Sequence, residues 1–263
     1  MRIGIMQGRL IPPEPERFQA FPRTRWQQEF ALAATVGLQS IEWIYDLHGQ
    51  DVNPIATAEG IQSMQRLAAE HDVAVVSICA DYFIDRPTLD QDKLVWLLER
   101  CHLAGISRLV VPFVDASRIE TPAQTERITA TLREVLPDAV RHQVEIHLET
   151  SLPPGSFAAM LNALPHPLLK VNYDSGNSAS LGYPVAEEFA AYGERIGSIH
   201  IKDRLRNGGT VPLLSGAADF PTLFKALKKI GYSGDFVLQT ARETPGEEVA
   251  LAQRNLSWLR SWL

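Results

Sequence analysis

The chain has 263 residues, of which 45% are hydrophobic and 21% charged, a balance typical of globular proteins. This composition excludes a disordered chain, a collagen and a coiled coil. The 25 Lys and Arg residues against 31 Asp and Glu residues give a formal charge of −6, so the surface offers no basic footprint for nucleic acid. We therefore predict that nucleic acid is not a partner.

The cysteines and the apolar runs bear on the cellular compartment. Cys79 and Cys101 are too few for a disulfide framework or a multi-cysteine zinc site, and they are typical of buried thiols in a reducing compartment. The opening MRIGIMQGRL lacks a signal-peptide pattern, and no run approaches 18 apolar residues. We therefore expect a cytoplasmic protein with no membrane partner.

Short runs rich in Val, Ile and aromatic residues alternate along the chain with longer amphipathic stretches. The short runs predict strands over residues 3–6, 40–44, 73–79, 108–113, 144–149, 169–173, 198–202 and 236–240. The longer stretches predict helices over residues 24–36, 55–71, 87–104, 122–141, 156–163, 185–195, 220–230 and 247–263.

Eight strand-helix units favour an α/β fold with a single (β/α)8 TIM barrel as one domain over residues 1–263, because such barrels typically occupy ~250 residues. A doubly wound sheet also alternates strands and helices, but the first strand is followed by QGRLIPP and not by a Gly-rich phosphate turn. The longest irregular stretches, 7–23 and 203–219, follow the first and seventh strands. Barrels keep their active sites in loops of this kind.

Four predicted strands carry polar residues in strict alternation with apolar ones: VEIHLETS, KVNYDSGN, SIHIKDR and DFVLQTAR. With helices outside, the polar set faces the barrel axis. Glu149, Asp174, His200 and Gln239 then converge at the carboxyl ends of four successive strands, which lie ~4.8 Å apart. Oxygen and imidazole ligands in this arrangement suit Mn²⁺, Mg²⁺, Co²⁺ or Zn²⁺. The alternative is that each residue caps its own strand or pairs with a neighbour.

At these residues the sequence resembles the xylose isomerase-like barrel superfamily, specifically its sugar and sugar-phosphate isomerase and epimerase branch. The resemblance covers nearly the whole chain, through IEWIYD, HLET, YDSGN, SIHIKDR and LLSGAADFPTLFKALKKIGYSGDFVLQTAR. It implies one divalent metal held by Glu149, Asp174, His200 and Gln239.

Two positions depart from the family pattern. The usual residue at Gln239 is Glu, which in many members is both a ligand and one of two catalytic carboxylates. Glutamine keeps an oxygen for coordination but has no accessible proton chemistry. Asn177 stands where several members carry a substrate-binding His.

Further candidates face the predicted barrel interior or follow a strand. Glu42 is expected either at the substrate or in a structural ion pair, and Lys202 either at the substrate or beside Asp203. The predicted catalytic residues are Glu149, Glu42 and Lys202; the predicted substrate-binding residues are Trp43, Asn177, Arg204 and Arg9. Tyr45 could also line the pocket, and His147 is expected to pack one pleat below the ligands, with metal ligation as the alternative.

These features favour a divalent-metal-dependent isomerase or epimerase of a small sugar, sugar phosphate or hydroxy-keto acid, with Glu149 moving the proton next to the carbonyl. Gln239 favours proton transfer on one face unless Glu42, Lys202 or a bound water supplies the second group. The alternatives are an inosose-type dehydratase and a weakened sugar- or metal-binding barrel. A nuclease like AP endonuclease is disfavoured, because such sites need about three metals and more His ligands. Trp258 and Trp262 indicate either packing or a subunit contact, which leaves a homo-oligomer open.

Overall fold

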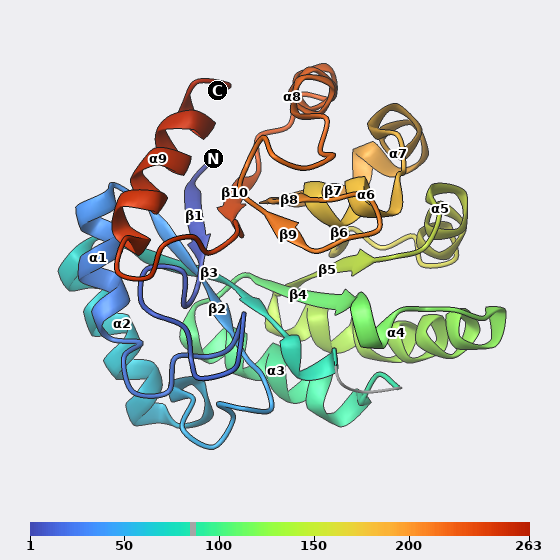
Figure 1. Cartoon of the computed structure of the whole chain (residues 1–263). Helices are drawn as coiled ribbons and strands as arrows, with labels where there is room; N and C mark the ends of the chain where they lie inside the picture. Colours follow the sequence, from blue (N-terminus) through green and yellow to red (C-terminus); the bar gives the residue numbers. More distant parts are fainter. Residues whose placement is uncertain (85–87) are drawn as a thin grey trace.

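The computed structural model describes residues 1–84 and 88–263. In this part of the chain eight parallel strands close into a barrel in the order β1-β10-β7-β6-β5-β4-β3-β2, surrounded by helices (Figure 1). The strands are β1 (Ile3–Met6), β2 (Ser40–Ile44), β3 (Ala74–Cys79), β4 (Arg108–Phe113), β5 (Glu145–Thr150), β6 (Leu169–Asp174), β7 (Ile196–Ile201) and β10 (Asp235–Leu238). The predicted (β/α)8 fold is confirmed. The first and last residues of each predicted strand lie within two residues of those of an observed strand.

The helices are α1 (Gln28–Val36), α2 (Ala58–His71), α3 (Gln91–Ala104), α4 (Pro122–His142), α5 (Pro154–Asn162), α6 (Ser175–Leu181), α7 (Val185–Tyr192), α8 (Phe220–Lys229) and α9 (Glu248–Arg260). The predicted start of the third helix at residue 87 lies outside the described residues. Side-chain caps fix several starts: Thr121 and Gln124 form a capping box on α4, and Asp219 accepts a hydrogen bond from the Thr222 N–H of α8. Among the described residues no helix is both long and apolar enough to cross a membrane.

Two elements were not predicted. The seven-residue helix α6 follows β6 directly, and a small hairpin of β8 (Asp203–Arg204) and β9 (Thr210–Val211) lies within the segment after β7. Short 3₁₀ turns cover Pro54–Ala56, Asp81–Phe83, Asp115–Ser117 and Gly193–Arg195. The segment between β1 and α1 has no helix or strand, as predicted for a long loop after the first strand.

The outward faces of the strands pack on the helices and form the core. Trp43 on β2 is fully buried against Phe21, Trp26 and Phe30, with ring centroids 5.5 to 6.2 Å apart. The inward faces remain polar at the carboxyl ends. In the register of β6 and β7, Asp174 lies directly beside His200, so strand pairing alone brings two predicted ligands together.

Candidate active site

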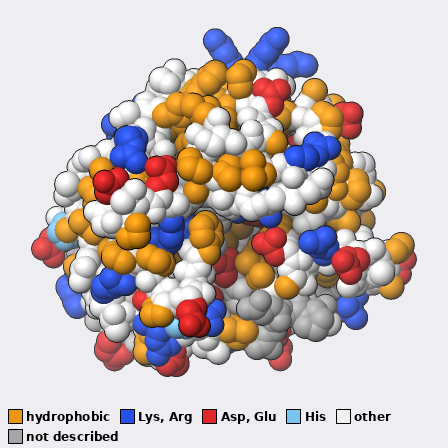
Figure 2. Space-filling model, in the orientation of Figure 1, with side chains coloured by type: hydrophobic (Ala, Val, Ile, Leu, Met, Phe, Trp, Pro, Cys, Tyr) orange, Lys and Arg blue, Asp and Glu red, His pale blue; other side chains and the backbone are white. Residues whose placement is uncertain are grey.

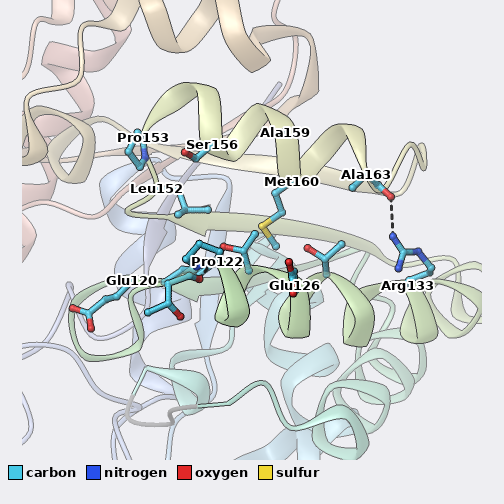
Figure 3. Close-up of a pocket in the computed structure, with 14 residues that line it drawn as sticks. Glu120, Pro122, Glu126, Arg133, Leu152, Pro153, Ser156, Ala159, Met160 and Ala163 are labelled. Atoms are coloured by element: carbon cyan, nitrogen blue, oxygen red, sulfur yellow. Dashed lines mark hydrogen bonds between the residues drawn. The ribbon is translucent and has the colours of Figure 1, made fainter.

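A cavity of about 540 Å³ opens at the carboxyl ends of the strands. Its lining includes Glu149, Asn177, Lys202, Arg204 and Gln239, all of them predicted site residues. The space-filling view shows a hollow near the middle of this face, bordered by both basic and acidic side chains (Figure 2). A larger cavity of about 740 Å³ lies outside the barrel between α4 and α5, and none of the predicted site residues lines it (Figure 3).

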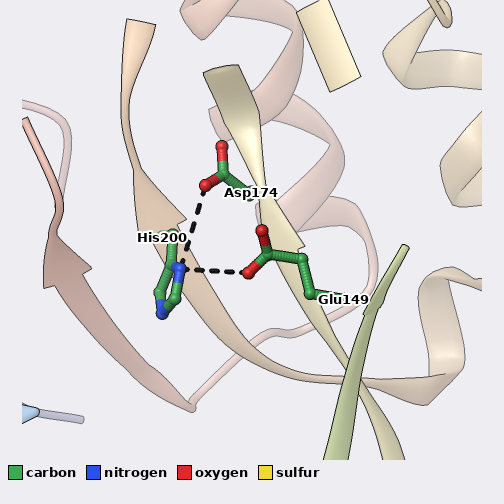
Figure 4. Close-up of side chains that lie close together, drawn as sticks. All are labelled: Glu149, Asp174 and His200. Atoms are coloured by element: carbon green, nitrogen blue, oxygen red, sulfur yellow. Dashed lines mark ion pairs between the residues drawn. The ribbon is translucent and has the colours of Figure 1, made fainter. Parts of the chain in front are cut away.

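Glu149, Asp174 and His200 point toward one another from β5, β6 and β7 (Figure 4). One ligand atom from each lies within 4.8 Å of the others, and all three residues are buried. His200 Nδ1 lies 3.3 Å from Glu149 Oε2 and 3.8 Å from Asp174 Oδ2. This nitrogen is buried and has no hydrogen-bond partner among the described residues. An orphaned imidazole nitrogen facing two carboxylates is a donor set that fits a divalent ion.

Glu42 holds the other side of His200. Its Oε1 lies 2.6 Å from His200 Nε2, and both side chains are fully buried. Burial alone would lower the pKa of His200, but the contacts with Glu42 and Glu149 raise it to about 10. The Glu42 contact fixes the ring so that Nδ1 faces the two carboxylates, as partners of metal-binding histidines commonly do.

Two amides fix the Glu149 carboxylate. Asn172 Nδ2 donates to Oε2 at 2.8 Å, and Asn177 Nδ2 donates to Oε1 at 2.6 Å. Burial would raise the pKa of Glu149, but His200, Lys202 and Asn172 together lower it. Glu149 is therefore held ionised and in one orientation, as a ligand or a base requires.

Lys202 lies between Asp174 and Gln239. Its Nζ is 3.4 Å from Asp174 Oδ2 and 3.3 Å from Gln239 Oε1. A Cβ on Gly176 would come within 2.8 Å of Lys202 Cγ, so the YDSGN motif needs a glycine where this side chain passes. Asp203 faces away and accepts the backbone N–H groups of Gly216 and Ala218. The Lys202 ammonium therefore lies at the cavity and does not pair with Asp203.

Arg204 and Asn177 form one wall of the cavity. Arg204 donates to Asn177 Oδ1 at 2.8 Å and lies 3.8 Å from Asp115. The structure brings these two predicted substrate-binding residues together, with the Asn177 amide bridging Arg204 and Glu149.

Besides Asp174 and His200, three predicted residues are not among those that line the cavity. Trp43 is fully buried on the outer face of β2, because the alternation that turns Glu42 inward turns Trp43 toward the helices. Glu42 is itself buried and contacts His200, as in the ion-pair alternative expected for it. Arg9 bonds to the Thr240 and Phe18 carbonyls and to Gln19 Oε1, so it holds the loop after β1 in place.

His147 lies deeper in the barrel, as expected. It contacts Ser198 at 2.7 Å and Glu145 at 2.8 Å, and Ser198 donates to Asn172. Burial lowers the pKa of His147 to about 4, so the ring is a neutral link in a polar chain that reaches Glu149 through Asn172.

Several residues of the cavity wall were not predicted from the sequence, among them Asp81 and Gln19. Asp81 comes two residues after the end of β3, and an acid so close to the carboxyl end of a predicted strand was a signal that could have found it. Gln19 comes from the irregular segment after β1, where no pattern predicts a direction. Gln19 accepts a hydrogen bond from Gln239 Nε2 at 3.1 Å and donates to Asp81 Oδ2 at 2.7 Å.

Residues 30–262 match the family described as xylose isomerase-like TIM barrel. The chain belongs to this family. Within it, the chain is 25% identical over 260 aligned residues to L-ribulose-5-phosphate 3-epimerase UlaE of Shigella flexneri serotype 5b (strain 8401), covering 90% of this chain and 89% of that protein.

Solved structures share the fold of this xylose isomerase-like barrel. D-psicose 3-epimerase from Clostridium cellulolyticum H10, crystallised with D-tagatose, has a TM-score of 0.78 at 15% identity, covering 100% of this chain and 99% of that one. The IolI protein with a bound zinc atom has a TM-score of 0.76 at 16% identity, with the same coverage of 100% and 99%. Together with the curated relative, these comparisons support an enzyme of the isomerase and epimerase type.

Proposed function

We propose that this chain is a divalent-metal-dependent epimerase or isomerase of a ketose or ketose phosphate. The observation that carries the proposal is the buried group of Glu149, Asp174 and His200, of which Glu149 lines the cavity, with an imidazole nitrogen that faces two carboxylates and has no hydrogen-bond partner among the described residues. The curated relative is named for L-ribulose 5-phosphate and a structural neighbour for D-psicose. Both are ketoses, which supports this substrate class.

The residues have distinct parts in the proposed reaction. A divalent ion at Glu149, Asp174 and His200, with Gln239 as a weaker fourth ligand, would supply a Lewis acid that stabilises negative charge on the substrate carbonyl oxygen. Glu149 removes the proton from the carbon next to the carbonyl, and the electron pair of that C–H bond passes into an enediolate. The Glu149 carboxylate stays oriented for this step because Asn172 and Asn177 each donate to one of its oxygens.

The remaining polar groups bind the substrate. Lys202 presents an ammonium to the cavity beside Asp174, where it can donate to a substrate oxygen. Arg204 and Asn177 lie on the same wall and offer donors for hydroxyl or phosphate oxygens. Arg9 positions the loop above them through its contact with Gln19.

The test of this function is deuterium incorporation from solvent. The Mn²⁺-loaded protein is incubated in D₂O with D-psicose, L-ribulose or L-ribulose 5-phosphate, and exchange at the carbons beside the carbonyl is followed by NMR. We expect exchange with at least one ketose, and we expect Glu149→Gln to slow it by roughly 10² to 10⁴ without unfolding the protein, since this is the usual cost of losing a general base.

The matched control is Glu16→Gln, which removes the same charge from an exposed residue at the rim of the same cavity. Activity above about a tenth of wild type in Glu149→Gln would assign the base to another residue. A metal-loaded wild type that exchanges none of the ketoses would support a binding barrel instead.

A cytoplasmic location and a homo-oligomer stay predictions. The first is consistent with Cys79 and Cys101, which are free and buried. The second rests on the last helix, where Trp258 packs edge-on against Phe220 while Trp262 stacks on Phe224 and is 38% exposed. A small sugar remains the proposed partner.

A further inference from the structure

Inverting a carbon beside a carbonyl requires two proton-transfer groups, one on each face of the planar intermediate. Gln239 directly follows β10 and places an amide in the cavity wall, and an amide cannot give or take a proton at neutral pH. Lys202 is turned toward Asp174 and Gln239, and Glu42 is buried under His200. The second group, if the chain has one, must come from elsewhere in the cavity.

Five carboxylates line the cavity: Glu16, Asp46, Asp81, Asp115 and Glu149. Asp46 accepts the backbone N–H groups of Phe21 and Gly49, one on each oxygen, and fixes the surrounding loops. Glu16 and Asp115 are exposed at the rim. Besides Glu149, this leaves Asp81 as the acid placed inside the cavity wall.

Asp81 lies in the half of the ring that does not carry the predicted ligands. It follows β3, and in the closed ring β3 lies four positions from β7, the strand of His200, and two positions from β5, the strand of Glu149. The strands of Glu149, Asp174, His200 and Gln239 are contiguous and form one half of the ring. A substrate held by its oxygens on that half therefore presents its other side to β3.

Asp81 is also held in a fixed orientation. Gln19 Nε2 donates to Oδ2 at 2.7 Å and the Cys79 thiol donates to Oδ1 at 3.2 Å, so each oxygen accepts one bond and keeps a second lone pair. Gln19 in turn accepts from Gln239 Nε2 at 3.1 Å. A chain of hydrogen bonds thus links Asp81 to the amide that stands in the fourth ligand position.

We propose that Asp81 is the second proton-transfer group of this site and acts on the substrate face that Glu149 does not reach, an inference that rests on the proposed epimerase function. In one direction Glu149 takes the proton, the C–H electron pair forms the enediolate, and protonated Asp81 returns a proton to the same carbon from the other side. In the reverse direction the two residues exchange roles. Solvent resets the pair, so no further reactant is needed.

The pKa of Asp81 is compatible with a role as proton donor and acceptor. Burial raises the pKa of Asp81 to about 6, and the negative charges of Asp46 and Glu149 act in the same direction, while hydrogen bonds from Gln19 and Cys79 lower it. Arg9 is the nearby cation that interacts with Asp81 through its charge. A pKa raised to about 6 leaves part of Asp81 protonated closer to neutral pH than an exposed carboxyl would be.

The experiment compares Asp81→Asn with wild type and with Glu16→Gln, as Mn²⁺-loaded full-length chains in D₂O, using whichever ketose the wild type exchanges. Each epimer is supplied separately, and NMR follows both deuterium incorporation and epimer formation. For Asp81→Asn we expect exchange from the epimer whose hydrogen faces Glu149 to stay within tenfold of wild type. Epimer formation should fall by roughly 10² or more. Glu16→Gln should resemble wild type.

Retained exchange also proves that the variant is folded and loaded. Epimer formation by Asp81→Asn within tenfold of wild type would overturn the inference, and so would equal loss of exchange from both epimers, which would indicate a positioning role. A wild type that exchanges a ketose without inverting any carbon would overturn only the role of Asp81. A wild type that exchanges no ketose would reject the proposed function, and the role of Asp81 with it.

Discussion

Glu42 is a carboxylate buried beneath His200, a predicted metal ligand, and would act on a bound ion through the imidazole ring. Glu42 contacts His200 Nε2 at 2.6 Å and fixes Nδ1 toward Glu149 and Asp174. Glu42→Gln keeps the shape of the side chain but removes the carboxylate charge that makes the His200 imidazole a stronger ligand. Since such partners usually contribute 10- to 100-fold, we expect Mn²⁺ affinity measured by calorimetry to fall by about tenfold. Unchanged affinity, in a variant that matches the Glu16→Gln control in stability, would contradict this role.

Gln239 makes the predicted ligand set less negative than its glutamate counterpart would be. Glu149 and Asp174 supply two formal charges, and Gln239 Oε1 contributes only a dipole, which faces the Lys202 ammonium at 3.3 Å. Gln239→Glu adds a third negative charge, and we expect it to bind Mn²⁺ more tightly without loss of the fold. Calorimetry on the two metal-free proteins measures this. Equal or weaker binding would mean that residue 239 does not face the ion.

At the scale of elements, the loop between β1 and α1 places Gln19 in the cavity wall. The buried acid Glu29 holds the start of this loop. Glu29 on α1 accepts the Gly8 N–H at 2.6 Å, and burial raises the pKa of Glu29 from 4.5 to about 8. An acid with a raised pKa in the folded state holds a proton that the unfolded chain has lost. Its contribution to stability is therefore full below pH 4.5 and is lost as the pH rises toward 8.

This anchor predicts a difference in the pH dependence of stability. Between pH 5 and pH 7.5 the free energy of unfolding of wild type should decrease relative to that of Glu29→Gln, by up to about 1.4 kcal/mol per pH unit for one proton. Urea unfolding of both proteins at several pH values isolates this contribution, because other titrating groups are common to both. Parallel curves would show that Glu29 is ionised in the folded protein at neutral pH.

The elements show which features of the sequence carry enough information for prediction. Alternating polar and apolar residues located the strands and turned Glu149, Asp174 and His200 inward, since side chains on a strand alternate strictly. Helix α6 was missed because SGNSASL has no apolar periodicity; its start is fixed by Asp174, which caps the Asn177 N–H. Gln19 reaches Gln239 across 220 residues, and no local pattern predicts such a contact.

At the scale of the whole molecule, the two halves of the barrel contribute different residues to the candidate site. The contiguous strands β5, β6, β7 and β10 carry or directly precede the predicted ligands. On the other half of the ring, β2 carries Glu42, which contacts His200, and Asp81 follows β3. This division explains how a site can be built from residues far apart in the chain. That residues 1–263 form one domain stays a prediction, and a single cooperative unfolding transition in calorimetry is the result it expects.

The proposed function depends most on the binding of one divalent ion at the carboxyl ends of β5, β6 and β7. The direct measurement is anomalous diffraction from crystals of the full chain grown with Mn²⁺. We expect one strong anomalous peak between Glu149, Asp174 and His200, within coordination distance of His200 Nδ1. No peak there, or a peak only elsewhere on the molecule, would contradict it.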